Sequence, residues 1–374
     1  MTKSGSPNVA ITLGDVAGIG PEVVARACAD GRVRGSCRPL VVGHPQILRR
    51  AATLAGVRLA VRELDALDAL SALEADPGQV ACWNPAGDAA LAVPPATVDP
   101  RAGDAAYRCL LAATQAALAG HVDAIVTAPI SKAALHAAGH HYPGHTEILA
   151  ELCGVQRYAM MLYLPTACEG QGTGPRPTSE ESANTSSARV PVPCPSHGVS
   201  SSGLAVAHVT LHTSIASVPG LLTAAGVLEK IELTIAFLER IGCSSPRVGV
   251  SALNPHAGEE GLFGDEEPRI IRPAVESARA MYGEAAFVDG PIPADTLFRR
   301  ALDGEFDGVV AMYHDQGHIA LKLAGLGRAV NVTLGLPIVR TSPSHGTAFD
   351  IAWQGVARAE GIVDAIRLAV RLKA

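Results

Sequence analysis

Histidines and carboxylates stand where apolar, strand-like stretches of this sequence end. The clearest case is "AMYHDQGH" at positions 311–318, where His314 and Asp315 directly follow an apolar run. In open sheets built from alternating strands and helices, ligands bind at the carboxyl ends of the strands. These side chains are therefore candidates for metal, proton or substrate chemistry.

Two further histidine positions resemble the first. "LAVAHVTLHTSI" alternates like a strand, which predicts that His208 packs inside and that His212, near its end, opens into a cleft. His256 follows the strand-breaking Asn-Pro of "SALNPHAGEE" and should lie in a loop. Three imidazoles, from His212, His256 and His314, could hold one divalent metal with an open coordination position. Histidines on separate strands can equally be structural, so spacing alone leaves the metal open.

Other polar residues could bind an anion. Lys322, Asn331 and Arg340 supply two fixed positive charges and an amide within a mostly neutral span, a combination that suits phosphate or carboxylate. They could also be ordinary solvated side chains. In "PGHTEILAELCG", His145 and Thr146 precede a helix predicted to start near 147, where Thr146 could be an N-cap or part of an anion site.

Nucleotide-binding fingerprints are absent from the sequence. It contains neither GxGxxG nor GxxxxGK[ST], which disfavours a standard Rossmann dehydrogenase or a P-loop NTPase. "SHGTAFD" predicts a Gly-containing turn, whose His345 and Asp350 could contact a nucleotide.

The elements that must position these residues alternate between strands and helices. Strands are expected over 8–14, 38–43, 122–130, 247–253 and 306–313, and helices over 20–30, 44–56, 106–120 and 228–242. This alternation predicts an α/β fold with a mainly parallel sheet covered by helices.

The composition limits the function classes. The chain has 374 residues, 48% hydrophobic and 18% charged, with a net charge of −6 and no long basic run, so a nucleic-acid surface is not expected as its main function. Eight cysteines form no CxxC pair, which argues against a zinc ribbon and suits reduced thiols in a cytoplasmic protein. Positions 203–228 lack charges, but two histidines and a proline favour a strand, a loop and a helix start over a membrane span.

One segment differs from the rest. Residues 169–203 are rich in Ser, Pro, Gly and Thr without apolar periodicity, which predicts a largely disordered insertion. A lid over a site is the alternative, because long loops often border sites. His197 and Cys194 within it are weak candidates for ligands.

Taken in order, the motifs resemble one family. "ITLGDVAGIGPE", "TAPISK", "PGHTE", "LNPHAGEEGLFGDEE", "GPIPADTLF", "YHDQGH" and "GRAVNVTLGLPIVRTSPSHGTAFDIA" are similar to the 4-hydroxythreonine-4-phosphate dehydrogenase (PdxA) family, from about residue 8 to residue 372. The resemblance implies one chain, 1–374, of two α/β lobes around a central cleft, similar to isocitrate and isopropylmalate dehydrogenases. It also implies an obligate homodimer and NAD or NADP binding without GxGxxG.

The resemblance assigns roles by motif. The metal ligands would be His212, His256 and His314, with His314 contributed by the partner subunit and Zn, Mg or Co as the ion. Substrate contacts would come from His145, Thr146, Asp295 and Asp315, and the substrate phosphate would be bound by Lys322, Asn331 and Arg340. The general acid or base would be Asp295, Asp315 or His145. The adenosine side of the cofactor would meet the loop carrying His345, Gly346, Thr347 and Asp350.

The implied reaction oxidises 4-phosphohydroxy-L-threonine, and the resulting β-keto acid loses CO2 to give 3-amino-2-oxopropyl phosphate on the route to pyridoxal 5'-phosphate. Alternatives within the family are another four-carbon phosphorylated acid, such as threonate or erythronate phosphate, and an aromatic cis-dihydrodiol. From other classes, a phosphate acyltransferase-like enzyme and a ligand-sensing paralogue remain. The sequence departs from the family pattern at Val16, usually proline, at His318, usually apolar, and in the 169–203 insertion.

Overall fold

Twelve strands form one sheet in the part of the chain that the computed structural model describes, residues 6–72, 78–165, 203–325 and 327–373. The strands are β1 (Asn8–Thr12), β2 (Arg38–Val42), β3 (Ala60–Leu64), β4 (Gln79–Trp83), β5 (Ala124–Thr127), β6 (Ala159–Leu164), β7 (Leu204–His208), β8 (Arg247–Ser251), β9 (Phe287–Ile292), β10 (Gly308–Ala311), β11 (Val330–Leu334) and β12 (Val339–Pro343). Their order across the sheet is β3-β4-β2-β1-β5-β12-β11-β6-β7-β10-β8-β9.

The sheet consists of two parallel blocks joined by antiparallel strands. One block runs from β3 to β12 and the other from β7 to β9, and within each block all neighbours are parallel. Between them, β11 and β6 pair antiparallel with each other and with their outer neighbours, β12 and β7. The predicted α/β fold with a mainly parallel sheet is confirmed.

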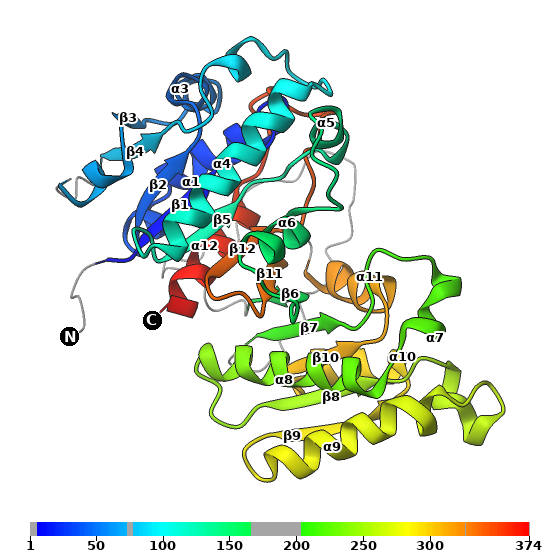
Figure 1. Cartoon of the computed structure of the whole chain (residues 1–374). Coiled ribbons are helices and arrows are strands. Elements are labelled where there is room, and N and C mark those ends of the chain that lie inside the picture. The colour runs from blue at the N-terminus through cyan, green and yellow to red at the C-terminus, as the bar shows by residue number, and fades with distance from the viewer. Residues whose placement is uncertain (1–5, 73–77, 166–202, 326, 374) are drawn as a thin grey trace, which may run out of the picture.

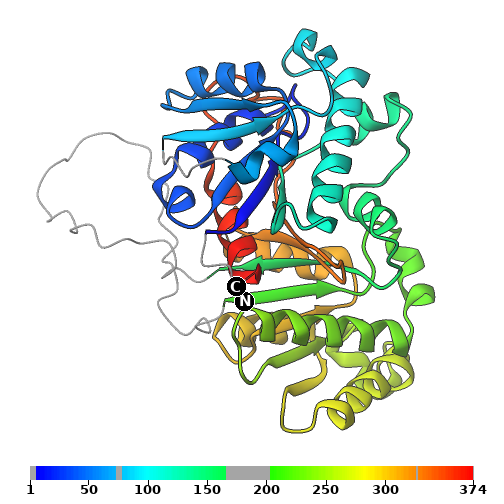
Figure 2. The ribbon, with the colours of Figure 1, turned by 60° about the vertical axis from the view of Figure 1, so that its left-hand side comes forward.

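The helices cover the two blocks separately. Figures 1 and 2 show α1, α3 and α4 around the upper block and α8, α9 and α10 around the lower one. The helices are α1 (Gly20–Ala29), α2 (Gly31–Arg34), α3 (Pro45–Leu54), α4 (Pro100–Leu118), α5 (Lys132–Ala137), α6 (His145–Leu152), α7 (Val218–Leu221), α8 (Ala224–Arg240), α9 (Arg272–Tyr282), α10 (Ala294–Leu302), α11 (His314–Gly325) and α12 (Glu360–Lys373).

The strands and helices form for ordinary local reasons. Strand β5 is buried along its whole length, as expected for a strand of a parallel sheet with helices on both faces. Helix α4 starts at Pro100, whose missing N–H costs nothing at a helix start, and the Asp99 carboxylate accepts a hydrogen bond of 2.8 Å from the Arg101 N–H.

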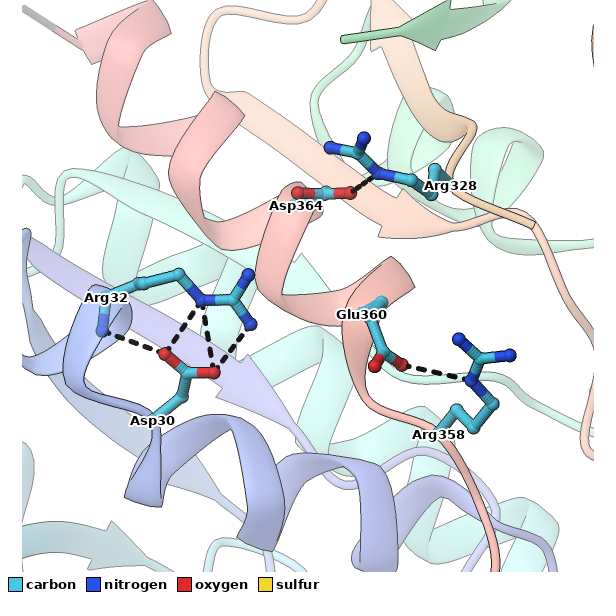
Figure 3. A network of polar contacts seen from close by, with 6 residues as sticks. All are labelled: Asp30, Arg32, Arg328, Arg358, Glu360 and Asp364. Carbon is cyan, nitrogen blue, oxygen red and sulfur yellow. Dashed lines mark hydrogen bonds and ion pairs between the residues drawn. The ribbon is translucent and has the colours of Figure 1, made fainter. Parts of the chain in front are cut away.

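Helix α12 packs against the middle of the sheet, on β12, β5 and β11. Ion pairs surround it (Figure 3): Arg328 bonds to the buried Asp364 at 3.1 Å, and Arg358 lies 3.5 Å from Glu360 at the helix start. In the same view Arg32 pairs with Asp30 near the end of α1. The exposed pairs contribute little to stability, whereas the Asp364 carboxylate needs its partner because it is shielded from water.

Positions 203–228 form β7, a loop with short helical turns, and the start of α8, as expected. Among the described helices, none combines the length and apolar character needed to cross a bilayer. Six cysteines are free thiols, while Cys168 and Cys194 lie outside the described residues. The predicted insertion, including His197, also lies outside them, except for Gly203.

Candidate active site

A pocket of about 220 Å³ opens over the middle of the sheet, where the two parallel blocks meet. Its floor consists of side chains from three central strands, β12, β11 and β6: Arg340, Ser342, Asn331, Met160 and Leu162. Successive side chains of a strand point to opposite faces, so alternate residues share this one. Thr341, between two floor residues, faces the other way and donates a hydrogen bond of 2.8 Å to the Ala365 carbonyl oxygen of α12.

The walls come from the segments that follow strands. Lys132 begins α5, the helix after β5, and residues 145–147 form the first turn of α6. His212 follows β7, and His314 and His318 belong to the first turns of α11, directly after β10. His212 and His314, which the sequence placed at strand ends, therefore both line this pocket, after β7 and β10.

Arg340 is the most deeply placed cation of the pocket. It is 2% exposed, and its guanidinium donates hydrogen bonds of 2.7 Å to the Thr127 hydroxyl and 3.0 Å to the Thr333 hydroxyl. Burial lowers the pKa of Arg340 to about 9, and the nearby Glu147 carboxylate acts against this shift. The side chain is therefore positively charged at neutral pH and has no hydrogen-bonded carboxylate, which is an arrangement suited to an anionic ligand.

Polar atoms without partners gather around the same pocket. Among the described residues, nine side-chain nitrogen or oxygen atoms are shielded from solvent and have no hydrogen bond. Five of them belong to residues that line the pocket: His145, Glu147, Asn331, Arg340 and His345. Because each such group costs about 1–3 kcal/mol when it is left unpaired, their convergence indicates a site built for a polar ligand.

His145 and Thr146 both line the pocket, as predicted, but Thr146 is not an N-cap. Helix α6 begins at His145, its N-cap residue is Gly144, and Thr146 lies buried in the first turn. Burial, followed by the positive charge of Arg340, holds the pKa of His145 well below its usual range. The imidazole is therefore neutral at physiological pH.

Two of the three predicted metal ligands lie together in one chain. The rings of His212 and His314 have centroids 5.8 Å apart, and both side chains line the pocket. His314 Nδ1 lies 2.7 Å from an Asp315 carboxylate oxygen, which can only accept, so Nδ1 donates and Nε2 keeps its lone pair for a ligand. His212 Nδ1 is 4.0 Å from Glu147 Oε1, and burial lowers the pKa of His212, with Lys132 acting in the same direction.

His256 lies elsewhere, in the loop after β8. Its nearest aromatic neighbour is Phe263, with ring centroids 6.2 Å apart, and it does not line the pocket. Residues 256–260 all have positive φ, an uncommon, strained run for side chains other than glycine. Within the described residues of one chain, no group of three or more His, Cys, Asp or Glu side chains could hold a metal. Of the three predicted ligands, His212 and His314 therefore lie together and His256 lies apart.

Of the other site residues predicted from the sequence, some line the pocket and others do not. Asn331, Arg340, His345 and Gly346 line it. Lys322, Asp295 and Asp315 are exposed on α11 and α10 and do not line it. Thr347 and Asp350 also lie outside the lining, although the Thr347 carbonyl oxygen accepts a hydrogen bond of 3.0 Å from the Ile19 N–H and so ties this loop to α1.

Sequence reasoning did not nominate two charged residues that line the pocket, Lys132 and Glu147. Both belong to motifs that carried the family resemblance, "TAPISK" and "PGHTE". Glu147 was expected only to begin a helix, since an acidic residue in a first turn complements the positive helix end. Nothing local separates such a residue from a functional one, so the motif itself was the available signal.

The stretch 311–318 is more ordered than a turn. Helix α11 starts at His314, so Gln316 and Gly317 lie in its first turns. The Gln316 amide accepts a hydrogen bond of 2.7 Å from the Met312 N–H and donates one of 2.8 Å to the Ala252 carbonyl oxygen, which joins the ends of β10 and β8. His208 is fully buried, as predicted.

Comparison with known proteins identifies the family. A model described as "Pyridoxal phosphate biosynthetic protein PdxA" matches residues 35–369. A D-threonate 4-phosphate dehydrogenase from Pectobacterium atrosepticum is 42% identical over 97% of this chain and 98% of its own. A 4-hydroxythreonine-4-phosphate dehydrogenase from Geobacter metallireducens is 43% identical over 98% of this chain and 95% of its own. A crystal structure of 4-hydroxythreonine-4-phosphate dehydrogenase from Klebsiella pneumoniae has a TM-score of 0.78 and 40% identity, covering 99% of this chain and 100% of that one. The chain therefore belongs to the PdxA family of dehydrogenases, as its ordered motifs predicted.

Proposed function

We propose that this protein oxidises the secondary alcohol of a four-carbon acid phosphate with NAD+ or NADP+, and that 4-phosphohydroxy-L-threonine is its substrate. The β-keto acid formed would then lose CO2 to give 3-amino-2-oxopropyl phosphate, an intermediate of pyridoxal 5'-phosphate biosynthesis. The observation that carries the proposal is the buried Arg340 guanidinium in a pocket whose shielded polar atoms lack partners.

The substrate phosphate is assigned to the floor of the pocket. Arg340 supplies a fixed charge, while the unpartnered Asn331 and His145 supply further polar contacts. A phosphate held there anchors one end of the substrate, so that remote binding energy aligns the reacting carbon. Lys132, on the wall, adds a second cation. Lys322 was also expected at the phosphate, but it is exposed on α11, so in our proposal it acts only if a second copy of the chain brings it there.

The metal is assigned to His212 and His314, with the remaining imidazole, His256, completing the set across a homodimer interface. The donor chemistry fits, because Asp315 leaves His314 Nε2 free as a ligand. This division differs from the implied one, in which His314 came from the partner subunit. A bound divalent ion, Zn2+, Mg2+ or Co2+, would stabilise negative charge on the substrate oxygen.

Proton transfer and cofactor binding are assigned to different residues. A pKa well below its usual range makes His145 a poor base at neutral pH, so we assign it to hydrogen bonding of the substrate. The two carboxylates expected as acid or base, Asp315 and Asp295, are both exposed, and Asp315 contacts the pocket through His314. A nicotinamide cofactor, when bound, would supply the hydride acceptor. We place its adenosine side at the loop 345–350, from which His345 and Gly346 reach the pocket.

A second candidate substrate is D-threonate 4-phosphate, because relatives with that name are 42% and 43% identical to this chain. It differs from the first at the carbon next to the carboxylate, which carries a hydroxyl in place of an amine. A neutral cis-dihydrodiol suits a pocket with two fixed cations less well.

The test is NAD(P)H formation by the purified protein with each phosphate. We expect a kcat/KM at least tenfold higher for one of the two phosphates than for a neutral cis-dihydrodiol. A faster reaction with the dihydrodiol would overturn the proposed substrate class.

A further inference from the structure

His318 occupies the pocket wall without a role in the proposed function. It lies on α11, is 6% exposed, and follows His314 by one helical turn. The two rings lie face to face, with centroids 3.7 Å apart and planes inclined by 11°.

His318 is fixed from behind by His208. Its Nδ1 lies 3.1 Å from His208 Nε2 and 3.2 Å from the His314 carbonyl oxygen. A carbonyl oxygen only accepts, so Nδ1 carries the ring proton, and the lone pair of His208 Nε2 can share it. His208 is fully buried against Gly317, where an added Cβ would lie 2.5 Å from His208 Nε2. The ring of His318 therefore has a fixed position and a fixed rotation.

His314 has two constraints, and they do different things. Its hydrogen bond to Asp315 determines which ring nitrogen keeps the lone pair. The Asp315 side chain is 67% exposed, so its hydrogen bond alone holds the His314 ring only loosely. The stacked face of His318 restricts the plane of the ring, which the hydrogen bond leaves free to swing.

We propose that His318 is a positioning residue, which holds the plane of the His314 imidazole so that its Nε2 points into the active site. The inference rests on the proposed function, in which His314 is a metal ligand. Groups that orient a ligand from behind commonly change metal affinity about 10- to 100-fold when they are removed. The flat shape of the His318 ring, rather than its nitrogen atoms, carries this role.

Two substitutions separate shape from chemistry. His318→Phe keeps a flat ring over His314 and removes both nitrogens, whereas His318→Leu removes the flat ring as well. The full-length protein, freed of metal, is titrated with Co2+, and the visible absorption bands report both affinity and coordination geometry. We expect Co2+ affinity within about threefold of the wild type for the Phe variant and about 10- to 100-fold weaker for the Leu variant.

A matched control removes a stacked histidine elsewhere. His140 lies flat on Tyr107, with centroids 3.9 Å apart and planes 16° apart, and does not line the pocket. His140→Leu should leave the Co2+ affinity unchanged. Circular dichroism checks that each variant is folded. If the Leu variant is unfolded, the comparison of the Phe variant with the wild type still tests whether the ring nitrogens are needed.

The outcomes distinguish this inference from the function on which it rests. If the Phe variant binds Co2+ as weakly as the Leu variant, a ring nitrogen of His318 acts instead of its shape. If the Leu variant binds Co2+ as tightly as the wild type, the stacking does not contribute to metal binding. Either result overturns the proposal. If the wild type takes up no Co2+, the metal assignment fails. In that case NMR of the protein labelled in its histidine rings still tests the positioning role. The ring-current shift of His314 should persist in the His318→Phe variant and disappear in the His318→Leu variant. An unchanged His314 signal in the Leu variant would refute the positioning role.

Discussion

The guanidinium of Arg340 donates a hydrogen bond of 2.7 Å to the hydroxyl of Thr127, which extends from the neighbouring strand β5. Two threonine hydroxyls thus hold a buried charge in place without neutralising it, because neither carries a negative charge. The positive charge remains available to a ligand that enters over the sheet.

Replacing this charge should therefore disable substrate binding. Arg340→Gln should lower kcat/KM by about 100- to 1,000-fold, which corresponds to about 3–4 kcal/mol, because a desolvated charged partner of the phosphate is lost. Steady-state kinetics measures the change. Arg49→Gln, at an exposed pair with Glu63, is the matched control and should change kcat/KM less than twofold. A loss below threefold at Arg340 would exclude it as a phosphate ligand.

Lys132 should contribute less, since its side chain is exposed. Lys132→Ala is expected to raise KM about tenfold while kcat changes little, as for a charge that attracts an anionic substrate from the pocket wall. The same kinetic assay compares it with Lys373→Ala, whose side chain pairs with Asp123 away from the pocket. Equal KM values for the two variants would contradict a role for Lys132.

Asp15 should make stability depend on pH. The residue is fully buried, one carboxylate oxygen accepts a hydrogen bond of 2.9 Å from the Ala17 N–H, and the other has no partner. Burial raises the pKa of Asp15 from 3.8 to about 6. Between these values the native state binds more protons than the unfolded state, so this group lowers the unfolding free energy as pH rises from about 4 to about 6.

The substitution Asp15→Asn removes that dependence. Its unfolding free energy should exceed that of the wild type by about 1–3 kcal/mol at pH 7, and the difference should vanish near pH 4. Urea unfolding at pH 4, 5, 6 and 7 measures it, with the exposed Asp65→Asn as control. A difference that grows toward pH 4 would have the wrong sign for a raised pKa.

Glu267 should stabilise the strained loop that carries His256. Its fully buried carboxylate accepts hydrogen bonds from the Leu253 N–H at 2.9 Å, the Asn254 N–H at 2.7 Å and the Asn254 side-chain amide at 3.0 Å. Glu267→Ala leaves these donors without a partner and should cost about 2–5 kcal/mol of unfolding free energy. Glu267→Gln, which keeps an acceptor for the backbone N–H groups, should cost less.

Hydrogen exchange locates this effect, because the amides of residues 253, 254 and 256–258 should exchange faster in the Ala variant. Glu284→Ala, at an exposed position, serves as control and should leave both quantities unchanged. Equal losses from Glu267→Ala and Glu284→Ala would contradict the anchoring role.

The fold could be predicted because its signals are local. Buried strands such as β5 are short apolar runs, and helices such as α4 begin at recognisable caps. The burial of His208 also followed from alternation along β7, but that strand ends at His208, so His212 lies in the loop after it and not near the end of the strand. The antiparallel pairing of β6 and β11 was not predictable, since it depends on which strands meet across a distance of more than 160 residues in the chain.

The site was only partly predictable for a related reason. Residues that follow strands, such as His314, were found because a strand end is visible in the sequence. Lys132 was missed because an exposed lysine carries no local sign of a pocket. Lys322 was nominated for its neighbours in the sequence, yet it lies on an exposed part of α11. The role proposed for His318 depends on its stacking on His314, one turn earlier on α11, and on its contact with His208, which the packing of α11 on β7 brings about.

The most direct measurement is the rate of NAD(P)H formation with 4-phosphohydroxy-L-threonine and with D-threonate 4-phosphate, before and after removal of metal by a chelator. The account predicts turnover of at least one phosphate, loss of that activity on chelation, and its return on addition of Zn2+, Mg2+ or Co2+. Undiminished turnover in the chelated protein, or no reduction of either cofactor with both phosphates, would contradict it.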